Sequence, residues 1–226
     1  MKRFDSVFLI LSGFFLSSLI LANAFVFKFV DVPLPIIGVA TISLGVLPYP
    51  ITFLCTDLIS ELYGKQRANA IVLTGAAVSV YMLVLLQIGR VLPVSHLQEP
   101  VIQDHYMAVF GQSARAIFAS MVAYLVAQFI DIRLYHFWRK LTDGRYLWLR
   151  NNASTMLSQL IDTTAVVTIL FYGVWSWSEI TAVIIASYVF KLLVAAADTP
   201  LMYLGTWLFA DIREESRKRG LIHESA

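Results

Sequence analysis

The chain has 226 residues, of which 58% are hydrophobic and 14% are charged, and its mean hydropathy is +0.73. Soluble domains are usually about 45–50% apolar and about 25% charged, so this composition argues against a soluble domain and indicates a membrane protein. The formal net charge is only +2, and the single cysteine, Cys55, rules out an internal disulfide and argues against a cysteine-based metal site.

Six apolar runs are long enough to cross a bilayer, whose hydrocarbon core requires about 20 residues of helix. They lie at about residues 7–27, 44–63, 68–92, 114–138, 153–175 and 180–210. We predict an all-α membrane protein, a bundle of six transmembrane helices, in which residues 1–226 form a single polytopic domain. The last run is longer than a bilayer requires, so we expect it to tilt or to continue into the cytoplasm.

The first run has a second interpretation, because Lys2 and Arg3 precede it and Ala22-Asn23-Ala24 resembles a signal-peptidase site. Apolar residues continue beyond this point through Phe27, and five further runs follow. We therefore interpret the run as a membrane helix. Asn23, a polar residue near its end, is assigned a gating or structural role.

Residues 28–43 separate the first two runs and carry a weak strand signal, since apolar and polar residues partly alternate from Phe27 to Val32. We expect a folded, partly extended loop, and a short hairpin that dips into the protein is one form of it. Irregular backbone at membrane depth is tolerated only where it is buried in protein or lines a cavity, so this segment is a candidate wall of a site. An ordinary external loop is the alternative.

Basic residues are distributed unequally between the two sides of the predicted bundle. With both termini in the cytoplasm, all of the 17 Lys and Arg residues lie on the inner side except Lys28, Arg90, Arg115 and the mid-span Lys191. This bias follows the positive-inside rule, and it explains the basic C-terminal tail without direct nucleic-acid binding. We expect a multi-pass membrane protein.

The segment at 93–112 is polar and is expected to be an external loop. Its histidines, His96 and His105, are interpreted as solvated side chains, because histidines in a polar external loop are far more often solvated than bound to a metal. We therefore predict no metal site.

Polar side chains recur at helical spacing within three of the runs. One face of the fourth run carries Gln128 and Asp131, one face of the fifth carries Gln159 and Asp162, and one face of the sixth carries Tyr188, Lys191 and Asp198. A charge at the centre of a span costs about 2.5–3.5 kcal/mol, so such residues usually face a bundle interior or a wet cavity. We predict an interior polar cavity in which Asp162, Asp198 and Lys191 are partly paired and partly solvated.

The same residues have a structural interpretation, in which buried ion pairs and amide bonds only hold the helices together. Three aligned polar stripes and the repeated pattern Gln-x-x-Asp favour a ligand site instead. Carboxylates accept paired N–H donors, amides both donate and accept, and Tyr and Phe rings provide flat apolar walls. Such a cavity suits a small, planar, nitrogen-rich solute better than a sugar or a fatty acid.

The segment PYPITFLCTDLISELYGKQRA, residues 48–68, combines a Pro-Tyr-Pro entry with Thr-Asp, then Glu-x-Tyr-Gly and a basic pair. In this pattern, and in QFIDIRLYHFWRKL, LRNNASTMLSQLIDT and SYVFKLLVAAADTPLMYL, the chain resembles the queuosine precursor transporters, a vitamin-uptake-like family. The resemblance covers nearly the whole chain apart from 93–112 and both ends. It implies a six-helix inner-membrane transporter related in architecture to the substrate-binding subunits of energy-coupling-factor importers.

The resemblance also implies uptake of 7-cyano- and 7-aminomethyl-7-deazaguanine, planar solutes that agree with the predicted cavity. A carboxylate is expected to pair with the guanine-like N–H edge, and the two glutamines could read the opposite edge. The predicted substrate-binding residues are Asp57, Gln128, Asp131, Gln159, Asp162, Tyr188, Lys191 and Asp198.

Asp57 and Glu61 lie four residues apart and so share one helix face. We expect Asp57 to face the inner vestibule, and Glu61 to anchor the cytoplasmic end of the helix, where Lys65 is one turn away, or to gate exit. The alternative is that both are charges at the membrane interface, within reach of the surface.

The sequence lacks the enzymatic and ATP-binding motifs G-x-x-x-x-G-K-[ST], H-E-x-x-H and G-x-S-x-G. We therefore expect a transporter, not an enzyme, that requires no cofactor and works by alternating access or facilitated diffusion. Its expected partners are the 7-deazapurine solute and the lipid bilayer. A line of small residues at Ala119, Ala123 and Ala127 is expected to pack inside the bundle, and a homodimer contact is the alternative. Two alternatives stay open: a vitamin-binding subunit of an ATP-driven energy-coupling-factor importer, and a structural or assembly protein that binds no solute.

Overall fold

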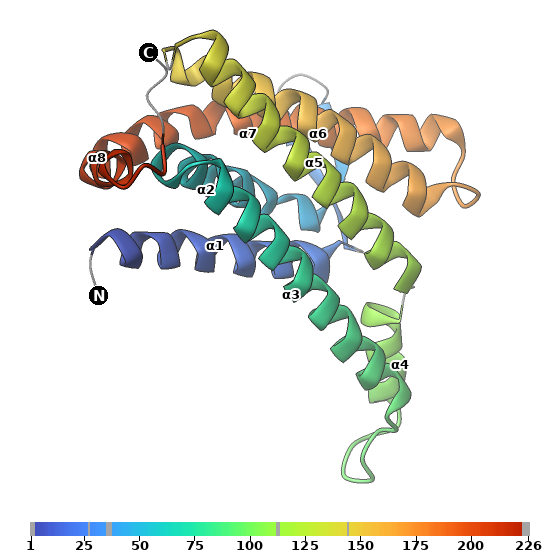
Figure 1. Cartoon of the computed structure of the whole chain (residues 1–226). Helices are drawn as coiled ribbons and strands as arrows, with labels where there is room; N and C mark the ends of the chain where they lie inside the picture. The colour runs from blue at the N-terminus through green and yellow to red at the C-terminus, as the bar shows by residue number, and fades with distance from the viewer. Residues whose placement is uncertain (1–2, 27, 35–37, 112–113, 144, 223–226) are drawn as a thin grey trace.

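The computed structural model describes residues 3–26, 28–34, 38–111, 114–143 and 145–222. Eight α-helices and one β-hairpin make up most of this part of the chain (Figure 1). In chain order the elements are α1 Arg3–Phe25, β1 Phe29–Leu34, β2 Gly38–Ser43, the 3-10 turn η1 Leu44–Val46, α2 Tyr49–Tyr63, α3 Lys65–Val91, α4 Val101–Phe110, α5 Ala114–Leu141, α6 Leu147–Phe171, α7 Trp177–Leu208 and α8 Ala210–Lys218.

Four helices within the described ranges, α1, α3, α6 and α7, are long and apolar enough to cross a membrane. Their outer faces expose large apolar side chains, such as Leu73, Val80 and Val84 on α3, as a lipid environment permits. In α5, which has 28 residues, polar and charged side chains interrupt the apolar run, and α2 has only 15 residues. The structure therefore has a mostly helical, multi-pass architecture, with four of the six predicted spans meeting these criteria.

The segment between α1 and α2 forms a β-hairpin, which is one of the forms expected for it. Strands β1 and β2 pair antiparallel. Ser43 Oγ donates to the carbonyl of Val26 and accepts from the backbone N–H of Gly45, which joins the base of the hairpin to the end of α1 and to η1. Ile42 is fully buried and packs with Ala186 of α7, so the hairpin is part of the bundle.

Helix α2 begins at Tyr49, although the apolar run predicted a start near residue 44. Residues 44–46 form the separate turn η1. Proline lacks an N–H and clashes with a preceding helical turn, but it is tolerated in a first turn. Because Pro50 occupies the first turn of α2 and Pro48 precedes it, the helix cannot extend back to residue 44.

The expected external loop at 93–112 contains a ten-residue helix, α4. Figure 1 shows α4 beside the C-terminal end of α3 and close to the start of α5. Tyr106 Oη donates to the carbonyl of Leu86 on α3 at 2.9 Å, and its ring lies against Gly89, where a Cβ would overlap the phenol. This helix depends on contacts between residues far apart in sequence, which the polar composition of the segment does not reveal.

The last predicted run, 180–210, is divided in the structure. α7 ends at Leu208, the backbone changes direction at Phe209, and α8 follows. α8 lies at the same end of the bundle as the start of α1 (Figure 1). Arg3 joins the two, because it forms an ion pair of 3.0 Å with Asp211 and donates to the carbonyl of Leu208.

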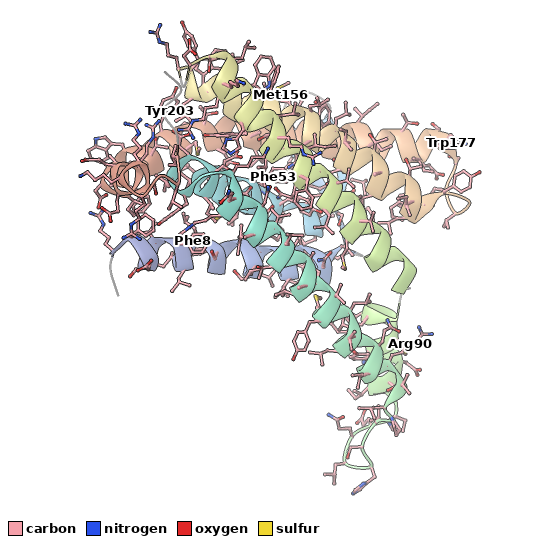
Figure 2. All side chains as sticks on the ribbon, in the orientation of Figure 1. Phe8, Phe53, Arg90, Met156, Trp177 and Tyr203 are labelled. Carbon is pink, nitrogen blue, oxygen red and sulfur yellow. The ribbon has the colours of Figure 1, made fainter. Side chains whose placement is uncertain are left out.

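The main apolar core lies where α1, α2, α3 and α5 meet. Gly75 allows α3 to approach α1 closely, since a Cβ there would lie 2.8 Å from the ring of Phe15. All residues of α2 from Cys55 to Tyr63 are buried, including the two charged ones. In Figure 2, Phe53 of α2 lies inside the bundle and Trp177 lies at its edge.

Candidate functional site

The candidate site is centred on an ion pair between Asp162 of α6 and Lys191 of α7, whose charged atoms are 2.8 Å apart. The two side chains are 2% and 6% exposed. The ammonium group also lies 4.6 Å from the centre of the Tyr49 ring at the start of α2, a cation–π contact. A lone buried charge is strongly destabilising, so each charged group requires the other.

A cavity of about 60 Å³, which we call the first hollow, lies directly beside this ion pair. It is bounded by the end of α1, the base of the hairpin, η1, α6 and α7, and it can hold several water molecules. Phe29, Tyr49 and Phe171 provide aromatic walls. The polar side chains in its lining are those of Asn23, Ser43, Asp162, Thr163, Ser187 and Lys191.

A second hollow, of about 10 Å³, is also lined by Tyr49 and Lys191. Its other polar residues, Thr155, Gln159 and Asp198, come earlier on α6 and later on α7 than those of the first hollow. Because α6 and α7 are consecutive helices joined by a short turn, these positions lie further from that turn. The contact between Tyr49 and Lys191 therefore separates the two hollows along the bundle.

Several polar atoms in the lining of the hollows have no hydrogen-bond partner within the described residues. They are Oε1 of Gln159, Oδ1 of Asp162 and Oγ1 of Thr163, all on buried side chains. Buried polar groups in folded proteins are normally hydrogen-bonded to protein or water. These atoms are therefore the ones available to water or to a polar solute.

A second polar cluster lies between α2, α5 and α6. Ser158 Oγ donates to Asp131 Oδ1 at 2.9 Å, and the side chain of Asp57 also contacts the Asp131 carboxyl. One turn before Asp131, Gln128 accepts a long hydrogen bond of 3.4 Å from Thr56. All five residues are at most 2% exposed, so the face of α2 that carries Asp57 is turned toward α5 and α6.

Glu61 forms a third cluster at the end of the bundle where α8 lies. Its carboxylate accepts a hydrogen bond of 3.0 Å from Tyr135 and pairs with Arg213 of α8 at 2.7 Å and with Arg139 of α5 at 3.7 Å. The side chain is fully buried. The sequence pointed to the exposed Lys65 as a partner and to an interface position as the alternative, whereas Glu61 is a buried junction of α2, α5 and α8.

The structure brings some of the predicted site residues together and separates others. Asp162, Lys191, Gln159 and Asp198 line the two hollows, as does Asn23. Asp57, Gln128 and Asp131 form the separate cluster between α2, α5 and α6. Tyr188 lines neither hollow, and its hydroxyl donates to the carbonyl of Met156 on α6 at 3.2 Å.

Four residues at these sites had no assigned role at the level of sequence: Tyr49, Thr163, Ser187 and Arg213. Ser187 precedes Lys191 by four residues, so helical spacing could have included it in the same stripe. Tyr49 stands in the Pro-Tyr-Pro entry of the quoted pattern. Arg213 carries no local signal, because its partner Glu61 is far away in the sequence. Among the described residues no group of three His, Cys, Asp or Glu side chains is placed to hold a metal ion.

Membrane-length helices around buried charges and internal hollows define a polytopic membrane protein with an interior polar site. Residues 43–205 match the model of a family described as "Putative vitamin uptake transporter", and the chain belongs to this family of membrane transporters.

Two curated relatives extend the comparison. The chain is 29% identical over 164 residues to a Bacillus subtilis (strain 168) protein named "Probable queuosine precursor transporter", covering 72% of this chain and 71% of that protein. It is 28% identical over 172 residues to the "Queuosine precursor transporter" of Escherichia coli (strain K12), covering 74% of this chain and 72% of that protein. No solved structure matches the chain.

Proposed function

We propose that this transporter imports queuosine precursors, the planar compounds 7-cyano-7-deazaguanine and 7-aminomethyl-7-deazaguanine. The names of the two curated relatives support this class of solute. The structural observation that carries the proposal is the buried Asp162–Lys191 pair beside an aromatic-walled hollow.

The ion pair offers hydrogen-bond donors next to an acceptor. Lys191 carries three N–H donors, and Oδ1 of Asp162 has no partner among the described residues. A guanine-like ring presents a carbonyl oxygen beside N–H groups. Its carbonyl would accept from Lys191, and its N–H groups would donate to Asp162, while the rings of Tyr49 and Phe171 cover its flat faces.

The proposed topology places α1, α2, α3, α5, α6 and α7 across the cell inner membrane, with both termini in the cytoplasm, as in the substrate-binding subunits of energy-coupling-factor importers. The excess of basic residues on that side supports this orientation. The hairpin and the first hollow then lie toward the outside, and the second hollow lies toward the cytoplasm.

This topology suggests a simple path for the solute. It would enter the first hollow from the outer side and take up hydrogen bonds with Asp162 and Lys191. Separation of Lys191 from the Tyr49 ring would then join the first hollow to the second, where Gln159 and Asp198 offer further polar atoms. No hydrolysis by the chain is required in this scheme.

The proposal is tested by uptake of radiolabelled 7-cyano-7-deazaguanine into proteoliposomes. We expect Asp162→Asn to lower uptake at least tenfold, because a hydrogen bond to a charged group contributes about 1.5–3 kcal/mol and about 1.4 kcal/mol corresponds to a factor of ten. Thr163→Val, which leaves the ion pair intact, should lower uptake by a smaller factor. Asp104→Asn on the exposed α4 is the matched control and should transport normally.

Competition distinguishes the solute class. An excess of unlabelled 7-aminomethyl-7-deazaguanine should reduce uptake of the label, and an excess of ribose should not. Folded protein that takes up no deazapurine, or variants that all transport like the control, would contradict the proposal. Folding is checked by size-exclusion chromatography in detergent.

A further inference from the structure

Two aspartates from different helices meet in the cluster between α2, α5 and α6. Asp57 is 2% exposed and Asp131 is fully buried. Their carboxyl groups are in hydrogen-bonding contact with each other. Three hydroxyl groups of α6 surround the Asp131 carboxyl, since Ser158 donates to it at 2.9 Å and Ser154 and Thr155 also contact it.

A hydrogen bond between two carboxyl groups requires a proton, because an ionised carboxylate can only accept. Two ionised carboxylates in contact would also repel each other strongly in a buried site. Where proteins force two such groups together, the pair commonly holds one proton and one negative charge. The hydroxyls of α6 are placed to stabilise that remaining charge by donating to it.

Cations on the packed helices are held by other carboxylates. Lys191 pairs with Asp162, and Arg139 and Arg213 both pair with Glu61, one helical turn along α2 from Asp57. The packed helices hold further charged and titratable groups in ion pairs or hydrogen bonds with one another: Glu61 of α2, Tyr135 and Arg139 of α5, Asp162 of α6, Lys191 of α7 and Arg213 of α8. Arg67 of α3 lies over the rings of Phe4, Phe8 and Tyr63.

The aspartate pair is connected to the proposed path of the solute. Thr155, which contacts Asp131, also lines the second hollow. Gln159 lines the same hollow, is 4% exposed, and has an Oε1 with no partner among the described residues. On the α5 side, Nε2 of the fully buried Gln128 likewise has no acceptor in the described part of the chain. A hydrogen-bond acceptor and a donor without partners among the described residues thus lie beside the aspartate pair.

We propose that Asp57 and Asp131 form a proton-binding site that couples solute uptake to the entry of one proton. A proton from the external water binds to the pair when the solute is taken up, and the pair gives it to cytoplasmic water when the helices separate. The solute undergoes no chemical change. This inference rests on the proposed transport function, but it assigns these two aspartates to a proton and not to the solute.

The experiment separates coupling from transport in the same proteoliposomes. Exchange of labelled for unlabelled 7-cyano-7-deazaguanine reports transport alone, and accumulation driven by an alkaline interior, with the membrane potential clamped, reports coupling. The native protein should accumulate solute up to about tenfold per pH unit, since one proton per solute carries one factor of ten. Asp57→Asn and Asp131→Asn should retain exchange and lose accumulation, while Asp131→Glu should restore part of it. Asp104→Asn is again the control.

Exchange by the native protein without any response to the pH gradient would overturn the coupling and leave the proposed function standing. Absence of exchange would count against the proposed function. In that case a measurement without solute tests whether Asp57 and Asp131 share a proton. Infrared spectra of protein labelled with ¹³C in the aspartate carboxyl groups should show a protonated carboxyl band at neutral pH. That band should disappear in Asp131→Asn and persist in Asp104→Asn; a native protein without it would refute the shared proton.

Discussion

Lys191 buries an ammonium group between an aspartate and a tyrosine ring, and the pairing explains why the position is tolerated. Taking a charge out of water costs several kcal/mol, which the attraction to a partner only partly offsets. Removal of one partner leaves the other charge buried and alone. Removing one partner of the ion pair should therefore cost more stability than replacing both partners by uncharged side chains.

This asymmetry gives a prediction for stability. Lys191→Met alone should lower the free energy of unfolding by about 3–5 kcal/mol, and adding Asp162→Asn should recover much of that loss. Lys65→Met, at an exposed position, should change stability by less than about 0.5 kcal/mol. Denaturant unfolding in detergent measures all three.

Uptake by the same variants distinguishes a solute site from a structural ion pair. The single and double variants at Lys191 and Asp162 should both fail to take up the deazapurine. If the double variant is stable and transports normally, the ion pair only holds α6 and α7 together.

For individual residues of α5 and α6, helical spacing predicted which polar side chains point into the bundle. Gln128, Asp131, Gln159 and Asp162 are all buried, as their stripes indicated. The sequence predicted partial pairing of Lys191 with Asp162 and Asp198 but not which aspartate it contacts, because helical spacing fixes a face and not the neighbouring helix. Lys191 pairs with Asp162, and Asp198 instead lines the second hollow.

Among the secondary-structure elements, the junction of α2 and α3 depends on a single glycine. Gly64 has a φ of +85° and lies against the carbonyl of Leu221, where a Cβ would overlap the oxygen. A side chain at this position would therefore strain the backbone and displace the segment that follows α8.

We predict that Gly64→Ala destabilises the protein by about 1–3 kcal/mol, the usual cost of a residue in a glycine-only conformation. Trypsin should also cleave faster near Arg217 and Arg219, because the C-terminal segment would be released. Gly13→Ala is the matched control, since nothing lies within 4 Å of a Cβ there, and it should be neutral or slightly stabilising. Equal melting temperatures for the two variants would contradict the prediction.

Four of the six apolar runs overlap helices long and apolar enough to cross a membrane, because runs of apolar residues must be buried in lipid or protein wherever they lie. The elements that hydropathy did not locate depend on other forces. α4 is held by Tyr106 against α3, and the break before α2 reflects two prolines that hydropathy does not register. The division between α7 and α8 occurs at Phe209, which is itself apolar.

At the scale of the whole molecule, the orientation of the bundle is a separate prediction. Cys55 is the only cysteine and is buried, so the native chain offers little background to thiol reagents. In a Cys55→Ser protein, we expect Gln98→Cys, between α3 and α4, to react with an impermeant maleimide on intact spheroplasts. Lys218→Cys on α8 should react only after the membrane is opened, and the reverse pattern would invert the proposed topology.

The contacts of α8 have a consequence for the biosynthesis of the protein. Arg213 and Asp211 are translated long after Glu61 and Arg3, whose charges they balance. Chains emerge from the ribosome with the N-terminal part first, so α1 and α2 enter the membrane before these partners exist. Until α8 is synthesised, the carboxylate of Glu61 must accept hydrogen bonds from water or from other donors, because its ion pair with Arg213 cannot form.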